Sequence, residues 1–131
     1  MNRDQGAVST FLAVIALALL MAAGLVFDGG RKISALREAS HVAESAARAG
    51  AQAVDPDTYR TTGEIRVEAE QAITLAEDFL AVVGHDGEVK AEGDQVTVTV
   101  TITVDPALLP TGEMRVSATE TATATTEEPT T

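Results

Sequence analysis

The chain has 131 residues, about the length of one domain, and carries 20 acidic against 9 basic residues for a formal net charge of −11. A surface this acidic repels nucleic acid and anionic lipid headgroups, and one tyrosine without tryptophan offers little to stack on bases, so nucleic-acid binding is disfavoured. The chain has no cysteine, so a small exported domain would need another source of stability than disulfides, and we expect an assembly partner.

The first element predicted along the chain is a membrane helix over residues 7–27, after a short polar leader at residues 1–6. The segment reads "AVSTFLAVIALALLMAAGLVF", has no charge, and as a helix spans about 31 Å, enough to cross the hydrocarbon core. A cleaved secretory signal is the alternative, but its apolar region is only about 7–15 residues long. Met21 would also stand three residues before a cut after Ala23, where a small residue is required. We therefore expect a retained, single-pass helix.

The charges around this helix leave its orientation open. Arg3 is opposed by Asp4 before the span, whereas Arg31, Lys32 and Arg37 follow it, which mildly favours a cytoplasmic C-terminal part. The acidic, threonine-rich and cysteine-free remainder instead suits an extracytoplasmic location.

An alanine-rich helix is predicted over residues 28–54, with the glycine pair after Asp28 marking the membrane interface and allowing a kink. Small apolar residues recur there at steps of four and three, and we call these six the alanine seam: Ala35, Ala39, Val42, Ala46, Ala49 and Ala53. Small residues let helices approach closely, so the seam is a candidate helix-packing interface with other subunits. Packing against the rest of its own chain is the other interpretation, and both can hold along different turns.

A small α+β domain is predicted over residues 55–121, before a flexible tail at 122–131. Thr61 and Glu64 fit a capping box for a second helix that would end at Gly84. Three alternating segments then predict an antiparallel β-meander: "EVKAE", "QVTVTVTITV" and a strand that begins at Met114.

No residues in the sequence form a convincing catalytic, cofactor or metal site. His41 lies one helical turn from Glu38 and from Glu44, but one histidine and two solvated carboxylates do not close a site. His85 falls in a predicted turn. We expect neither an enzyme nor a small-molecule substrate or cofactor.

The residues quoted above resemble the TadE/TadG-like proteins of the tight-adherence (Flp) pilus machinery. The resemblance rests on the leader ending in Gly6, the Asp28–Arg31 segment "DGGR", the alanine-rich stretch at 43–51, and similar C-terminal segments, "VDPALLPTG" and "VSATETATA". It implies a pilin-like α+β subunit of the cell membrane with its N-terminus in the cytoplasm and its bulk outside, whose partners are other pilin-like subunits or the assembly machinery.

The same resemblance makes Gly6 and Ala7 a candidate leader-processing site. Pilins carry a glutamate at the fifth mature position, but a cut after Gly6 would place Phe11 there. The departure puts cleavage in doubt and favours a minor, pseudopilin-like component at a tip, in initiation, or retained in the membrane. A single-span binding or sensor module unrelated to pili is the alternative function.

Overall fold

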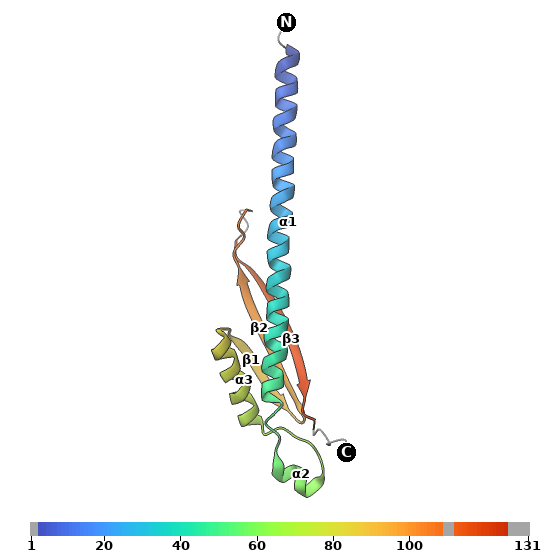
Figure 1. Cartoon of the computed structure of the whole chain (residues 1–131), viewed down its shortest axis with the longest axis vertical. Helices are drawn as coiled ribbons and strands as arrows, with labels where there is room; N and C mark the ends of the chain where they lie inside the picture. The colour runs from blue at the N-terminus through green and yellow to red at the C-terminus, as the bar shows by residue number, and fades with distance from the viewer. Residues whose placement is uncertain (1–2, 109–111, 126–131) are drawn as a thin grey trace, which may run out of the picture.

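The computed structural model describes residues 3–108 and 112–125, and it confirms the predicted α+β class. Three helices and three strands follow in the order α1 (Arg3–Gly50), α2 (Pro56–Thr62), α3 (Ala69–Val83), β1 (Gly87–Glu92), β2 (Gln95–Val104) and β3 (Met114–Thr123) (Figure 1). The N-terminal half of α1 projects far beyond the other elements, and its C-terminal half lies along the sheet (Figure 1).

The three strands form the predicted antiparallel meander in the order β1-β2-β3. Gly93, with a φ of 63°, makes the turn between β1 and β2, where a residue with a Cβ would be strained. β2 pairs with β3 along its whole length, from Gln95↔Thr123 to Val104↔Met114, whereas β1 reaches only as far as Val100. The last four residues of β2 therefore have no described strand on that side.

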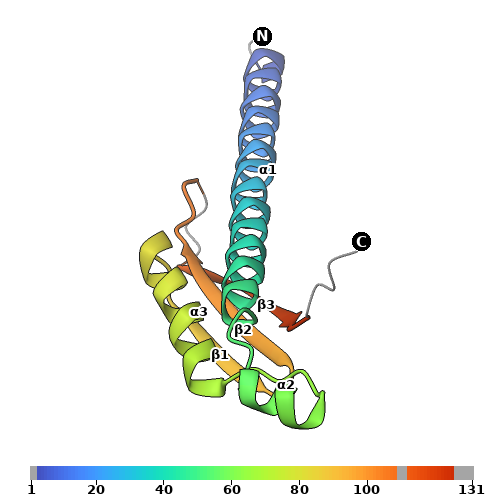
Figure 2. The ribbon, with the colours of Figure 1, turned by 60° about the horizontal axis from the view of Figure 1, so that its bottom comes forward.

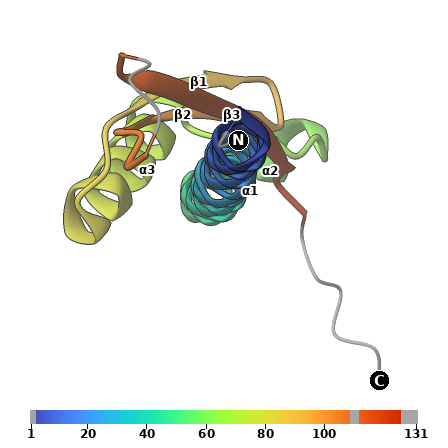
Figure 3. The ribbon, with the colours of Figure 1, turned by 90° about the horizontal axis from the view of Figure 1, so that it is seen from above.

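Both long helices pack on the same face of the sheet, as the view along α1 shows (Figure 3). The core lies between them and is built from alanines of α1 and α3 and from fully buried valines of β2: Val96, Val98 and Val100. The opposite face of the sheet carries hydroxyl pairs between β2 and β3, including Thr97 with Thr121 and Thr99 with Thr119. Valine and threonine alternate in β2 because one face is buried and the other is open to water.

Helix α1 is continuous across the glycine pair, where the sequence allowed a kink. Each glycine costs a helix interior about 1 kcal/mol relative to alanine, so the pair costs about 2 kcal/mol, and packing of the following turns outweighs this cost. Nothing lies within 4 Å of a Cβ added at Gly29 or at Gly30, so neither glycine serves a close contact.

The capping box predicted at Thr61 and Glu64 is wrong. Thr61 lies in the short helix α2, which Gly63 ends in the left-handed conformation, and α3 begins only at Ala69. Residues 64–67 are extended instead, because Val67 forms a bridge with Val54 and its N–H donates to the carbonyl of Gly93. Figure 2 shows α2 at the end of the molecule farthest from the N-terminus.

The other predicted boundaries differ by a few residues. The helix predicted to extend to residue 54 ends at Gly50, so Ala53 of the alanine seam lies beyond the helix. Gly84 ends α3 with a φ of 75°, as expected. β3 continues to Thr123, two residues into the segment predicted as a tail, while the rest of that tail from residue 126 lies outside the described residues. Residues 1–2 of the leader and 109–111 of the β2–β3 connection also lie outside them.

Candidate assembly and membrane interface

The N-terminal half of α1 exposes nearly all of its apolar side chains. Four large side chains are each exposed by 65% or more: those of Phe11, Leu12, Leu20 and Leu25. Within this half only the described positions Gly24 and Asp28 are buried. The helix passes the length and composition test for a membrane span, with a mean hydropathy of 2.6 in its most apolar window. An apolar surface of this extent requires lipid or other apolar partners around it.

The candidate processing residues lie at the start of this surface. Gly6 and Ala7 are both exposed and helical in α1. Phe11, at the position where the resemblance leads one to expect glutamate, is 65% exposed on the same helix.

The alanine seam lies against the chain's own sheet and against α3. Four of its members are buried: Ala39 and Ala46 completely, Ala53 to 3% exposure and Ala35 to 8%. Val42 and Ala49 are only partly buried. The interpretation of packing within one chain thus accounts for most of the seam, and contact with other subunits stays a prediction for its partly buried members.

The helices and the sheet approach one another closely at Gly50, the last residue of α1. A Cβ added there would lie 2.8 Å from the carbonyl oxygen of Ala72 in α3 and 2.9 Å from Cγ1 of Val96 in β2. Only a residue without a side chain lets the three elements meet here. The role of Gly50 depends on contacts with α3 and β2 that the sequence does not display.

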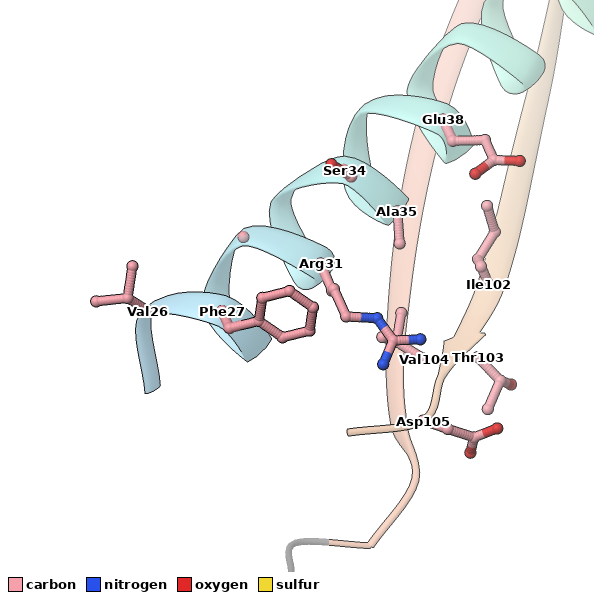
Figure 4. Close-up of a pocket in the computed structure, with 11 residues that line it drawn as sticks. Val26, Phe27, Arg31, Ser34, Ala35, Glu38, Ile102, Thr103, Val104 and Asp105 are labelled. Carbon is pink, nitrogen blue, oxygen red and sulfur yellow. The ribbon is translucent and has the colours of Figure 1, made fainter. Parts of the chain in front are cut away.

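An open groove of about 740 Å³ lies beside α1, at the level where the apolar half ends. Its walls are residues of α1 from Val26 to Glu38, the end of β2 from Ile102 to Val104, and the following residue, Asp105 (Figure 4). Arg31 reaches from α1 toward Val104 and Asp105 (Figure 4). The groove is bordered by the part of β2 that has no pairing with β1, and its walls are part apolar and part polar, with Arg31, Glu38 and Asp105 among the lining residues.

Asp28 holds the connection between β2 and β3 against α1, a role that the sequence analysis did not assign. Its carboxylate oxygens accept the backbone N–H groups of Ala107, at 3.0 Å, and of Leu108, at 3.3 Å. Asp28 is only 2% exposed, the single buried charged side chain in the described part of the chain. An acidic residue placed directly after a long apolar run was the one indication in the sequence of such a structural role.

The histidines take up surface positions. His41 is exposed. Nε2 of His85 lies 3.2 Å from Oε1 of Glu38, which links the end of α3 to α1. Across residues 3–108 and 112–125, the structure shows no group of three or more histidine, cysteine or acidic residues suited to a metal ion.

The pKa of the Asp55 carboxyl is clearly lowered. The hydroxyl of Thr58, and then the backbone N–H groups of Thr58 and Asp57, hold the pKa of its carboxyl below the ordinary value of 3.8. The carboxylate caps the N-terminus of α2, where Pro56 is the first helical residue.

Comparisons with known proteins complete the description of this interface. No curated protein and no solved structure matches the chain. Residues 6–53 match the model of a family described as putative Flp pilus-assembly TadE/G-like, which confirms the resemblance over the apolar and alanine-rich parts of α1 and supports involvement in the Flp pilus-assembly system.

Proposed function

We propose that the chain is a minor pilin-like component of a tight-adherence pilus or a related secretion system, and that it acts by packing and not by catalysis. The observation that carries the proposal is α1 itself: one continuous helix presents an exposed apolar half and packs its other half on a small sheet. The family match spans these two parts of the helix and little else.

The contacts with other subunits would be made by the parts of α1 that its own sheet leaves open. These are the apolar half at residues 7–27 and, further along, Ile33 and Leu36, which are 55% and 45% exposed. The partly buried Val42 and Ala49 border the covered face of α1 on the other side, about half a helical turn from Ile33, so they would offer a second and separate contact. The alanines buried in the core position α1 on its own domain, so they would shape the assembly indirectly.

In the proposed topology, the leader at residues 1–6 lies in the cytoplasm, and residues 28–131 lie outside it as one extracytoplasmic part. Protease added to intact spheroplasts should therefore remove the C-terminal domain. Protection until the cells are lysed would contradict this orientation.

The missing glutamate at Phe11 bears on the place of the subunit in the assembly. A buried glutamate that pairs with a neighbour's terminal amine stabilises a repeating contact in a low-dielectric interior. Phenylalanine offers no such pair, so we propose a subunit present in few copies. Mass spectrometry of the purified protein distinguishes a chain that begins at Ala7 from one with an intact leader. Abundance equal to that of the major pilin in sheared filaments would contradict a minor role.

The test of the function as a whole is deletion of the gene followed by electron microscopy of the cells. Loss or shortening of pili, restored by the intact gene, is the expected result. Normal pili in normal number would remove the proposal and leave the single-span binding or sensor module as the better account.

A further inference from the structure

The described part of the β2–β3 connection, residues 105–108, runs back along α1 past the end of the sheet. Val104, the last residue of β2, packs in a small cluster with Ala35. Four residues later, Leu108 lies beside Gly24: a Cβ added to Gly24 would be 3.5 Å from the Cβ of Leu108. The connection thus advances by about three turns of α1 toward the N-terminus.

This path brings Leu108 to the level of the apolar run at residues 7–27. Gly24 is three residues inside that run, which corresponds to about 4–5 Å along the helix axis. Leu108 is 62% exposed, and the side chains of α1 at its level are apolar and exposed as well, with Leu25 at 65% and Val26 at 76%. If α1 is embedded in the membrane, the lipid that surrounds Leu25 therefore also surrounds Leu108.

Backbone at this depth needs internal hydrogen-bond partners, since lipid offers none. Asp28 supplies them for two N–H groups of this segment, those of Ala107 and Leu108. Its burial to 2% exposure indicates that the carboxylate is enclosed between helix and connection and is not solvated at the surface. Leu108 lies against the helix at Gly24, where even an added Cβ would make only an ordinary contact with the Cβ of Leu108, at 3.5 Å.

We propose that residues 107–108 enter the acyl region of the adjoining bilayer leaflet beside α1, with Asp28 as the positioning residue that satisfies their backbone. The domain would then be attached to the membrane at two places, through α1 and through residues 107–108. The partner is the acyl chain of a lipid, as the continuity with the apolar surface of α1 requires. The inference rests on the proposed membrane span, and the test below separates the two.

The absence of cysteine allows single-site labelling of the full chain. Leu108→Cys, Val14→Cys and Lys90→Cys would each be labelled with an environment-sensitive fluorophore and reconstituted into phosphatidylcholine vesicles. Quenching by doxyl groups at carbon 5 of the acyl chain is then compared with quenching by iodide present on both sides. Val14 reports the span, and Lys90, exposed on β1, reports the water phase.

The expected result is lipid quenching at position 108 that resembles that at position 14, with iodide quenching far below that at position 90. If position 14 is quenched by lipid while position 108 is quenched by iodide, the span stands and the inference is overturned. Protection of position 108 from both quenchers also overturns it, since the leucine then contacts protein. Absence of lipid quenching at position 14 would instead refute the proposed membrane span itself.

Asp28 is tested through the same label. Asp28→Ala in the Leu108→Cys background removes both acceptors, so iodide quenching at position 108 should rise and lipid quenching should fall. The matched control is Asp86→Ala, an exposed acid in the turn before β1, which should leave both values unchanged. If Asp28→Ala leaves the label as deep in the lipid as before, the positioning role is refuted.

Discussion

Replacing Gly50 by alanine tests whether α1, α3 and β2 meet as closely as the structure shows. The new Cβ would lie 2.9 Å from Cγ1 of Val96, about 0.6–1.1 Å inside the 3.5–4.0 Å at which carbon atoms make their best contact. It would also lie 2.8 Å from the carbonyl oxygen of Ala72, a backbone atom that no rotamer change can move. The two helices must therefore shift apart.

Overfilling of this kind typically costs about 1–3 kcal/mol. Alanine is a better helix former than glycine by up to about 1 kcal/mol, but Gly50 is the last residue of α1, where the gain is smaller. The net loss should be about 1–2 kcal/mol, which for a domain of this size lowers Tm by on the order of 5–15 °C.

The assay is thermal unfolding of the full chain in detergent, followed by circular dichroism. Gly30→Ala is the control, because nothing lies within 4 Å of its added Cβ and the residue is inside the same helix. Its Tm should equal or exceed that of the unchanged chain. A Gly50→Ala chain as stable as the control would refute the close approach of the three elements.

Two further predictions concern the seam and the cap of α2. The double change Ala46→Leu with Ala49→Leu adds bulk to one fully and one partly buried position, and this overfilling should lower Tm at a cost of about 1–3 kcal/mol. The control pair, His41→Gln with Glu44→Gln on the polar face, should leave Tm nearly unchanged. Equal Tm values for both pairs would contradict packing of the seam on its own sheet. The folded-state pKa of Asp55 lies below 3.8, so its carboxylate contributes stability above that pH and loses the contribution as the pH falls through the lower folded value. Asp55→Asn should accordingly be less stable than the unchanged chain at pH 7, and the difference, measured by urea unfolding at a series of pH values, should shrink below about pH 4; a difference independent of pH would contradict the capping role of the charge.

The sequence predicted best those elements whose pattern comes from burial of one face. β2 alternates because its valines line the core, and the match is complete from Gln95 to Val104. Gly84 was identifiable as a helix end because the left-handed conformation favours glycine. The long apolar helix, a candidate membrane span, followed from hydropathy and length alone.

The errors arose where a local pattern competed with a distant partner. Thr61 and Glu64 fit a capping box, yet the bridge between Val54 and Val67 holds the following residues extended. The pair Asp55-Pro56 carried the better helix-start pattern, an N-cap acid followed by proline at the first helical position, and it begins α2.

The candidate interface was only partly predictable for the same reason. A seam of small residues is equally suited to a neighbouring helix or to the chain's own sheet, and only the tertiary structure shows that Ala39 and Ala46 are covered from within. The contact of Asp28 with the β2–β3 connection joins residues 79 and 80 positions apart, so no local pattern could reveal it.

The continuity of α1 has a consequence for rotation. Because the helix runs from Arg3 to Gly50 without a break, the direction in which the sheet faces is fixed relative to each exposed side chain of the apolar half. Each residue turns the helix by about 100°, so a single residue inserted between the two halves of α1 would rotate the domain by about that angle around the helix axis. An insertion of seven residues, close to two full turns, would nearly restore the original angle while lengthening α1 by about 10 Å. If subunits pack through their apolar halves, that packing fixes the direction in which each attached domain faces around the helix axis.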